Sequence, residues 1–139
     1  KPNNTYSFVL LSGHEHQFNP RSGRQLVYGG FQGLTGFPDS YFAGNLLTWS
    51  KLETRWFPEF EMGTVRPVWV AFINGAGAWS QKENYDLEDV EYRFGLGTRL
   101  GMTQSIQGLI NHLNLSWPIE KTGSIEWLPT FTLEAKYNL

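Results

Sequence analysis

The chain has 139 residues and a formal net charge of −2, which is the length of one domain. Proteins that bind duplex nucleic acid normally present a strongly basic surface, so we expect no nucleic-acid partner. The chain has no cysteine, which excludes disulfides, thiolate metal sites and cysteine nucleophiles. A membrane-spanning helix needs about 20 consecutive, mostly apolar residues, and the sequence contains no such run.

The composition is unusual for a soluble domain. Charged residues make up only 17 % of the chain, whereas aromatic residues reach 16 % and hydrophobic residues 40 %; an average globular chain has about 25 % charged residues. An aromatic-rich chain without long apolar runs must place its apolar side chains in alternation with polar ones. This is typical of a β protein, including one that faces lipid.

The first predicted strand is Tyr6–Leu10, where apolar side chains occupy alternate positions. A longer strand follows at Asn45–Phe57. It carries Lys51, Glu53 and Arg55 on one face and apolar residues on the other. A period of two with one apolar face indicates a strand rather than a helix.

Four further strands are predicted in the second half of the chain. Their ranges are Val68–Trp79, Val90–Met102, Leu109–Trp117 and Phe131–Leu139. The first of these is apolar on both faces, and we expect Pro67 at its start because proline cannot donate to an interior ladder. The second has the clearest alternation. No segment repeats its apolar residues at the helical period, so no helix longer than a turn is expected.

The connections differ in length. The long ones are Gly13–Gly44, which is rich in glycine, Ser80–Asp89 and Ile119–Trp127, and they share one end if the strands run up and down. Long outer loops and short inner turns are typical of outer-membrane barrels. The sequence therefore predicts a single domain over residues 1–139. It is an antiparallel up-and-down transmembrane β-barrel, or part of one, in contact with the lipid of a bacterial outer membrane.

Aromatic residues near the strand ends fit this prediction. Trp79, Trp117 and Trp127 would lie near the outer rim, with Trp56 and Tyr137 near the inner one, as aromatic girdles require. A soluble antiparallel sandwich also alternates apolar and polar residues, and it stays open as an alternative.

Five collinear motifs resemble a known family. They are Leu26–Pro38 (LVYGGFQGLTGFP), Leu52–Phe57 (LETRWF), Phe72–Trp79 (FINGAGAW), Arg93–Gly101 (RFGLGTRLG) and Leu113–Pro118 (LNLSWP). Together they resemble the outer-membrane protein insertase and translocator superfamily. That superfamily includes the central subunit of the barrel assembly machinery, the two-partner secretion transporters and the patatin-linked barrels.

The resemblance implies the C-terminal part of a sixteen-stranded barrel that supports insertion or export of polypeptides. It also implies that the long loop, residues 13–44, folds back into the barrel lumen. Leu34, Thr35, Gly36 and Phe37 would form the loop tip, and Asn74 would be its dock.

Two departures from the family pattern concern this contact. Thr35 stands where the family has an arginine, and Asn74 stands where it has the partner aspartate. Losing one member of a buried ion pair costs about 3–5 kcal/mol, whereas replacing both can be nearly free. We therefore hypothesise that Thr35 and Asn74 still face each other through a neutral hydrogen bond. The change puts in doubt any transport role that depends on the loop arginine.

Four charged residues are further candidates for the lumen face: Glu53, Arg55, Arg93 and Arg99. The lumen of a membrane barrel is generally polar. A solvated ladder of ion pairs is therefore the favoured interpretation of these residues, ahead of a specialised pore lining.

The sequence offers little for catalysis. It has no Gly-x-Ser-x-Gly elbow, and we expect no catalytic residue, no cofactor and no metal. His14 and His16 are interpreted as part of an exposed polar loop, with a metal site as the less favoured reading.

The number of predicted strands implies a partner. The six predicted strands are fewer than the eight of the smallest membrane barrels, so further strands from the same or another chain are expected. Two more strands could also lie within residues 13–44. Besides transport of a polypeptide substrate, the alternatives are a structural membrane anchor for a passenger domain and a soluble carbohydrate-binding sandwich.

Overall fold

The computed structural model of the chain describes residues 5–18, 25–30, 33–80, 85–102, 109–119 and 129–137. These residues form eight strands: β1 (Thr5–His16), β2 (Leu26–Tyr28), β3 (Phe42–Gly44), β4 (Leu46–Phe57), β5 (Val65–Trp79), β6 (Glu91–Met102), β7 (Leu109–Ile119) and β8 (Thr130–Tyr137). The one helical element in the described part of the chain is a 3-10 turn at Leu87–Asp89. The expected all-β class is confirmed.

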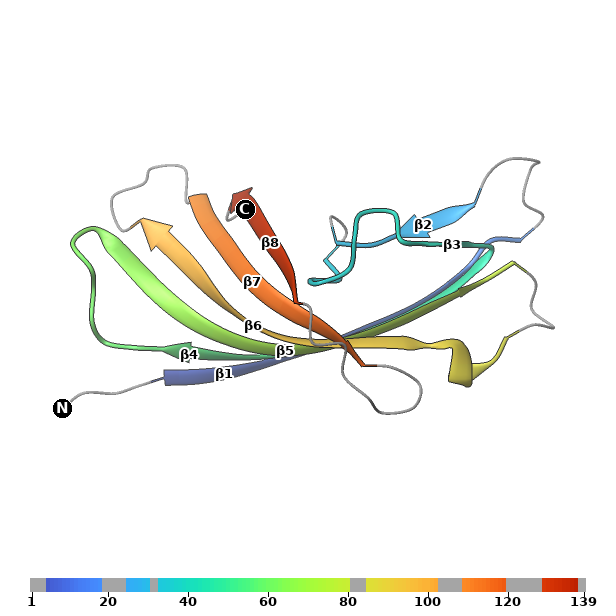
Figure 1. Cartoon of the computed structure of the whole chain (residues 1–139), viewed down its shortest axis with the longest axis horizontal. Coiled ribbons are helices and arrows are strands. Elements are labelled where there is room, and N and C mark those ends of the chain that lie inside the picture. Colours follow the sequence, from blue (N-terminus) through green and yellow to red (C-terminus); the bar gives the residue numbers. More distant parts are fainter. Residues whose placement is uncertain are drawn as a thin grey trace.

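Six of the strands form one antiparallel sheet in the order β1-β4-β5-β6-β7-β8. The sheet bends into a trough, and a separate two-stranded ribbon of β2 and β3 lies on its concave side (Figure 1). Within the described residues β1 and β8 are the two edges of this sheet. The expected up-and-down antiparallel order is therefore present, but the strands do not close into a barrel.

Two strand boundaries differ from the predicted ones by three residues or more. β1 continues from Leu10 to His16, because it pairs with β4 along its whole length, from Thr5 opposite Phe57 to His16 opposite Leu46. β5 begins at Val65, so Pro67 is the third residue of the strand rather than the first. The two short strands within residues 13–44 belong to the separate ribbon and not to the sheet.

The convex face of the sheet is apolar and exposed. Register places Phe8, Thr54, Ala71, Leu96 and Leu115 in one row across β1, β4, β5, β6 and β7. In this row Phe8 is 75 % exposed and Leu96 is 58 % exposed. The opposite face carries the charged residues of the same strands and the glycines of β6, because successive side chains of a strand point to opposite faces.

The hydrophobic core lies between the concave face and the β2–β3 ribbon. It consists of Leu34, Phe37, Phe42, Leu47 and Ala76. Ala76 belongs to β5, whose inner face is covered by this ribbon while its outer face is apolar like the rest of the convex side. This explains why β5 is apolar on both faces.

The aromatic residues near the strand ends occupy both ends of the sheet. Trp79 and Trp117 lie at the end where β5 and β7 finish, and Trp56 pairs with Trp69 toward the other end. Trp79 packs on Tyr85, with ring centroids 4.6 Å apart, and is only 5 % exposed. Trp127 and the side chain of Tyr137 lie outside the described residues. No described helix has the length and apolar character to cross a membrane.

Candidate functional site: a loop docked on the concave face

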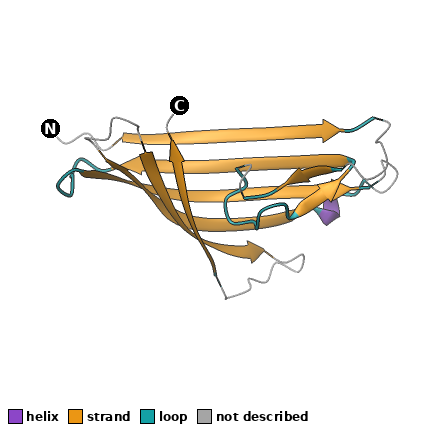
Figure 2. Cartoon of the chain, turned by 90° about the horizontal axis from the view of Figure 1, so that it is seen from above, coloured by secondary structure: helices purple, strands orange, loops and turns teal. Residues whose placement is uncertain are grey.

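The loop between β1 and β4 folds over the middle strands of the sheet (Figure 2). We call its described residues 25–30 and 33–45 the plug loop, and Leu34–Phe37 its tip. Backbone hydrogen bonds make the tip compact: Leu34 N–H donates to the Gly29 carbonyl over 3.2 Å, and Phe37 N–H donates to the Leu34 carbonyl over 3.1 Å. The β2–β3 pairing closes the base of the loop.

Glycine is required at the end of the tip. Gly36 has φ +95°, a region that residues with a side chain rarely adopt. A Cβ at this position would lie 2.7 Å from the Cβ and Oγ of Ser116 in β7. Gly33 has φ +111° as well, but a Cβ there would meet nothing within 4 Å. Gly36 therefore serves both the turn and the close approach to the sheet.

Three side chains of the sheet hold the tip, and all donate to its main-chain carbonyls. Asn74 Nδ2 donates to the Thr35 carbonyl over 2.6 Å. The Gly36 carbonyl accepts from Arg93 Nη1 over 2.8 Å and from Ser116 Oγ over 3.4 Å. These residues come from β5, β6 and β7, so the seat of the tip spans three neighbouring strands.

The structure thus brings Thr35 and Asn74 together, both of them buried. The bond differs in one respect from the hypothesis, because its acceptor is the main-chain oxygen of Thr35. An asparagine amide can donate to a carbonyl, whereas an ionised aspartate can only accept. The neutral residue at position 74 therefore suits a partner that is itself an acceptor.

The apolar half of the tip is also buried. Leu34 is 1 % exposed and Phe37 is 2 % exposed. The Phe37 ring lies edge-on to Phe42, with centroids 5.0 Å apart. On the other side the Arg93 guanidinium lies 5.0 Å from the centre of the same ring, a distance at which a cation is attracted to the aromatic face. Arg93 therefore contacts both the polar and the aromatic part of the tip.

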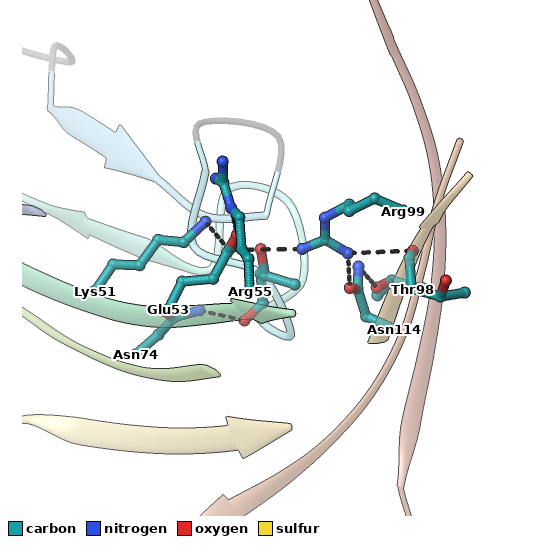
Figure 3. A network of polar contacts seen from close by, with 9 residues as sticks. Lys51, Glu53, Arg55, Asn74, Thr98, Arg99 and Asn114 are labelled. Carbon is teal, nitrogen blue, oxygen red and sulfur yellow. Dashed lines mark hydrogen bonds and ion pairs between the residues drawn. The ribbon is translucent and has the colours of Figure 1, made fainter. Parts of the chain in front are cut away.

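Beside the tip, one carboxylate is shared by three cations (Figure 3). Glu53 Oε2 lies 3.0 Å from Lys51 Nζ and 3.6 Å from Arg99 Nη2. Its other oxygen, Oε1, accepts from Arg55 Nε over 2.6 Å. The side chain of Glu53 is 1 % exposed and that of Arg99 is 9 % exposed. The expected solvated ladder is wrong in this respect, because Arg99 reaches across from β6 and its charge is buried with that of Glu53.

The same network continues toward the edge of the sheet. Arg99 Nη1 also donates to Asn114 Oδ1 in β7, and Asn114 Nδ2 donates to Thr132 Oγ1 in β8 over 3.3 Å. Polar groups of β4, β6, β7 and β8 are therefore linked across the concave face.

Ser116, Asn114 and Phe42 belong to this site and were not predicted from the sequence. Ser116 and Asn114 have the same parity in β7, and an alternation of small polar residues was the available signal for them. Their roles depend on neighbours in β6 and in the loop, which a local pattern does not reveal.

At the rim of the concave face, Tyr41 of the plug loop donates to Glu91 Oε2 over 3.0 Å. Burial, and next the hydrogen bond and negative charge of Glu91, raise the pKa of the Tyr41 hydroxyl above its ordinary value. The phenol therefore keeps its proton and remains a donor.

The histidine pair lies at the end of β1 and not in a loop. His14 Nδ1 forms a 2.8 Å hydrogen bond with Thr48 Oγ1. Among the residues that the structure describes, no group of three or more histidines and carboxylates could hold a metal ion.

No family model, no curated protein and no solved structure matches the chain, so the family suggested by the motifs stays a prediction.

Proposed function

We propose that the chain forms part of the wall of a bacterial outer-membrane β-barrel, with the plug loop inside the lumen, in a protein that supports insertion or export of polypeptides. The observation that carries this proposal is the contrast between the two faces of the sheet. The convex face exposes large apolar side chains, while the concave face carries the charged residues and is covered in part by a loop (Figure 1).

In water, the exposure of so many large apolar side chains on the convex face would be unfavourable. Phe8, Leu10 and Leu133 are each more than half exposed, at 75 %, 74 % and 65 %, and they belong to one continuous sheet surface. Contiguous exposed apolar patches mark sites that meet a partner or a membrane. A barrel wall with an apolar outside and a polar inside accounts for both faces.

The open edges of the sheet set a further requirement. An unpaired backbone N–H or C=O group in hydrocarbon costs several kcal/mol, and β1 and β8 each have one edge that no described strand covers. The proposed wall therefore needs further strands, supplied by the same chain or by another.

A polypeptide in transit would have to pass the plug loop. The tip is held by three hydrogen bonds from the sheet, and it fills the space above β5 and β6. This firm seat favours a second candidate function, in which the barrel is a closed membrane anchor for a passenger domain and moves nothing.

The first experiment compares folding in detergent micelles with folding in plain buffer. A compact band on an unboiled gel that shifts on boiling, obtained only in detergent, is expected for the membrane wall. The apparent mass of this band also shows whether copies associate. A monodisperse β-rich monomer in plain buffer would overturn the proposal and favour the soluble carbohydrate-binding sandwich.

Conductance across a planar bilayer separates transport from anchoring. In the transport proposal, weakening the seat of the tip with Asn74→Leu increases the open probability relative to the unsubstituted chain. Asn111→Leu is the control, since Asn111 has the parity of Leu115 in β7 and lies on the face opposite the plug loop. If neither variant conducts although both are folded and inserted, the closed anchor is favoured.

A further inference from the structure

The convex face contains a hollow that the plug loop does not touch. Its volume is about 460 Å³. Small side chains form its floor, namely Thr54, Ala71 and Thr98, and large apolar side chains surround them, namely Trp56, Trp69, Leu96, Leu113, Leu115 and Phe131. No charged side chain lines it, so the hollow suits an apolar ligand.

The register of the sheet explains the hollow. Ala71 lies opposite Thr54 on one side and opposite Leu96 on the other, so two small side chains adjoin in one row. In the next row Trp69 lies opposite Thr98. The large side chains next to these small residues project outward from the sheet: Leu96 is 58 % exposed and Trp69 is 47 % exposed.

We propose that this hollow seats one acyl chain of a membrane phospholipid. The proposal rests on the proposed function, because it takes the convex face to be the lipid-facing side of a membrane wall. The hollow is continuous with that face, since all of its large walls belong to the same apolar surface.

The position of the two tryptophans also favours a lipid chain. Trp56 is the next-to-last residue of β4, and Trp69, opposite it in register, is the fifth residue of β5, so both lie in the half of the sheet nearer the 58–64 turn. Aromatic residues of membrane barrels gather at the headgroup level. A phospholipid whose headgroup lies beyond the 58–64 end of the sheet directs its chain past the tryptophans and onto Ala71, toward the middle of the sheet.

The test measures lipid retained by the folded chain. The protein is inserted into vesicles of palmitoyl-oleoyl phosphatidylethanolamine, extracted with mild detergent and weighed intact by native mass spectrometry. We expect one retained phospholipid per chain. Ala71→Phe fills the hollow and Trp69→Ala removes a wall, and each is expected to reduce the retained fraction at least tenfold.

Ala135→Phe is the matched control, because Ala135 is an exposed residue of β8 outside the hollow. It is expected to retain lipid like the unsubstituted chain. Equal retention by all four proteins, or equal loss in the control, would overturn the proposal. These outcomes differ from failure of the proposed function, in which the unsubstituted chain would fold in plain buffer and would not insert into vesicles at all. Trp69→Ala keeps the test decisive if Ala71→Phe does not fold.

Discussion

Asn74 holds the tip of the plug loop with a single amide hydrogen bond. Its Nδ2 donates to the Thr35 carbonyl over 2.6 Å while the side chain is fully buried. A carboxylate at this place would face an oxygen acceptor without a hydrogen to share. The neutral pair is therefore a self-consistent arrangement.

Asn74→Asp should accordingly release the tip of the plug loop. We expect it to lower the free energy of unfolding by about 2 kcal/mol or more, since a buried group loses its partner and gains a charge. Urea unfolding in lipid vesicles measures this loss. Asn45→Asp is the control, because Asn45 makes the same kind of bond to Ser80 but is only half-buried. A similar loss in both variants would show that the buried bond at Asn74 contributes no more to the free energy of unfolding than the bond at Asn45.

Gly36 combines two constraints that substitution can separate. Gly33→Ala introduces a Cβ at a positive φ and nothing more, which costs about 1–2 kcal/mol. Gly36→Ala has the same cost, and its Cβ also lies 2.7 Å from the Ser116 side chain. This overpacking adds about 1–3 kcal/mol. Adding Ser116→Gly to Gly36→Ala should recover the second part, as read from protease cleavage of the plug loop. No recovery would mean that the tip does not rest on β7.

At the scale of strands, the Glu53 cluster ties β4 to β6. Three cations lie within 3.6 Å of this carboxylate. Removing one partner of a buried ion pair costs about 3–5 kcal/mol, so Glu53→Gln should destabilise the sheet by about that amount. Urea unfolding is again the measurement.

Glu61→Gln provides the comparison for this prediction. Glu61 pairs with Arg66 over 3.2 Å, but both side chains are exposed. An exposed pair contributes at most about 1 kcal/mol. If Glu53→Gln costs no more than Glu61→Gln, the burial of Glu53 does not strengthen its ion pairs.

The elements that the sequence predicts well are those with local alternation. The pattern of Val90–Met102 places β6 (Glu91–Met102) within one residue. β1 was predicted too short, since Ser12, Gly13 and His14 have no apolar alternation and are held as a strand by pairing with β4. The contact of Thr35 with Asn74 was suggested by motifs. The burial of Glu53 was not, because it depends on Arg99, which is distant in sequence and two strands away in the sheet.

For the whole molecule, the decisive property is the polarity of the convex face. Leu96 lies in the middle of β6 and Met102 at its end, and both point outward and are more than half exposed. In a membrane wall Leu96→Arg should cost about 2–4 kcal/mol, and Met102→Arg about 0–1 kcal/mol, because the cost of a charge depends on depth. Unfolding in lipid vesicles measures both. Equal, small effects would point to a surface that faces water.

The direction of the edge strands restricts how a barrel can be completed. Each strand of the sheet is antiparallel to its neighbour along the order β1-β4-β5-β6-β7-β8, so the first and the last strand run in opposite directions. An antiparallel closure can therefore add only an even number of strands between β8 and β1, because an odd number would force one parallel pair. A second copy of the described sheet would meet this condition, and so would a longer even-numbered segment.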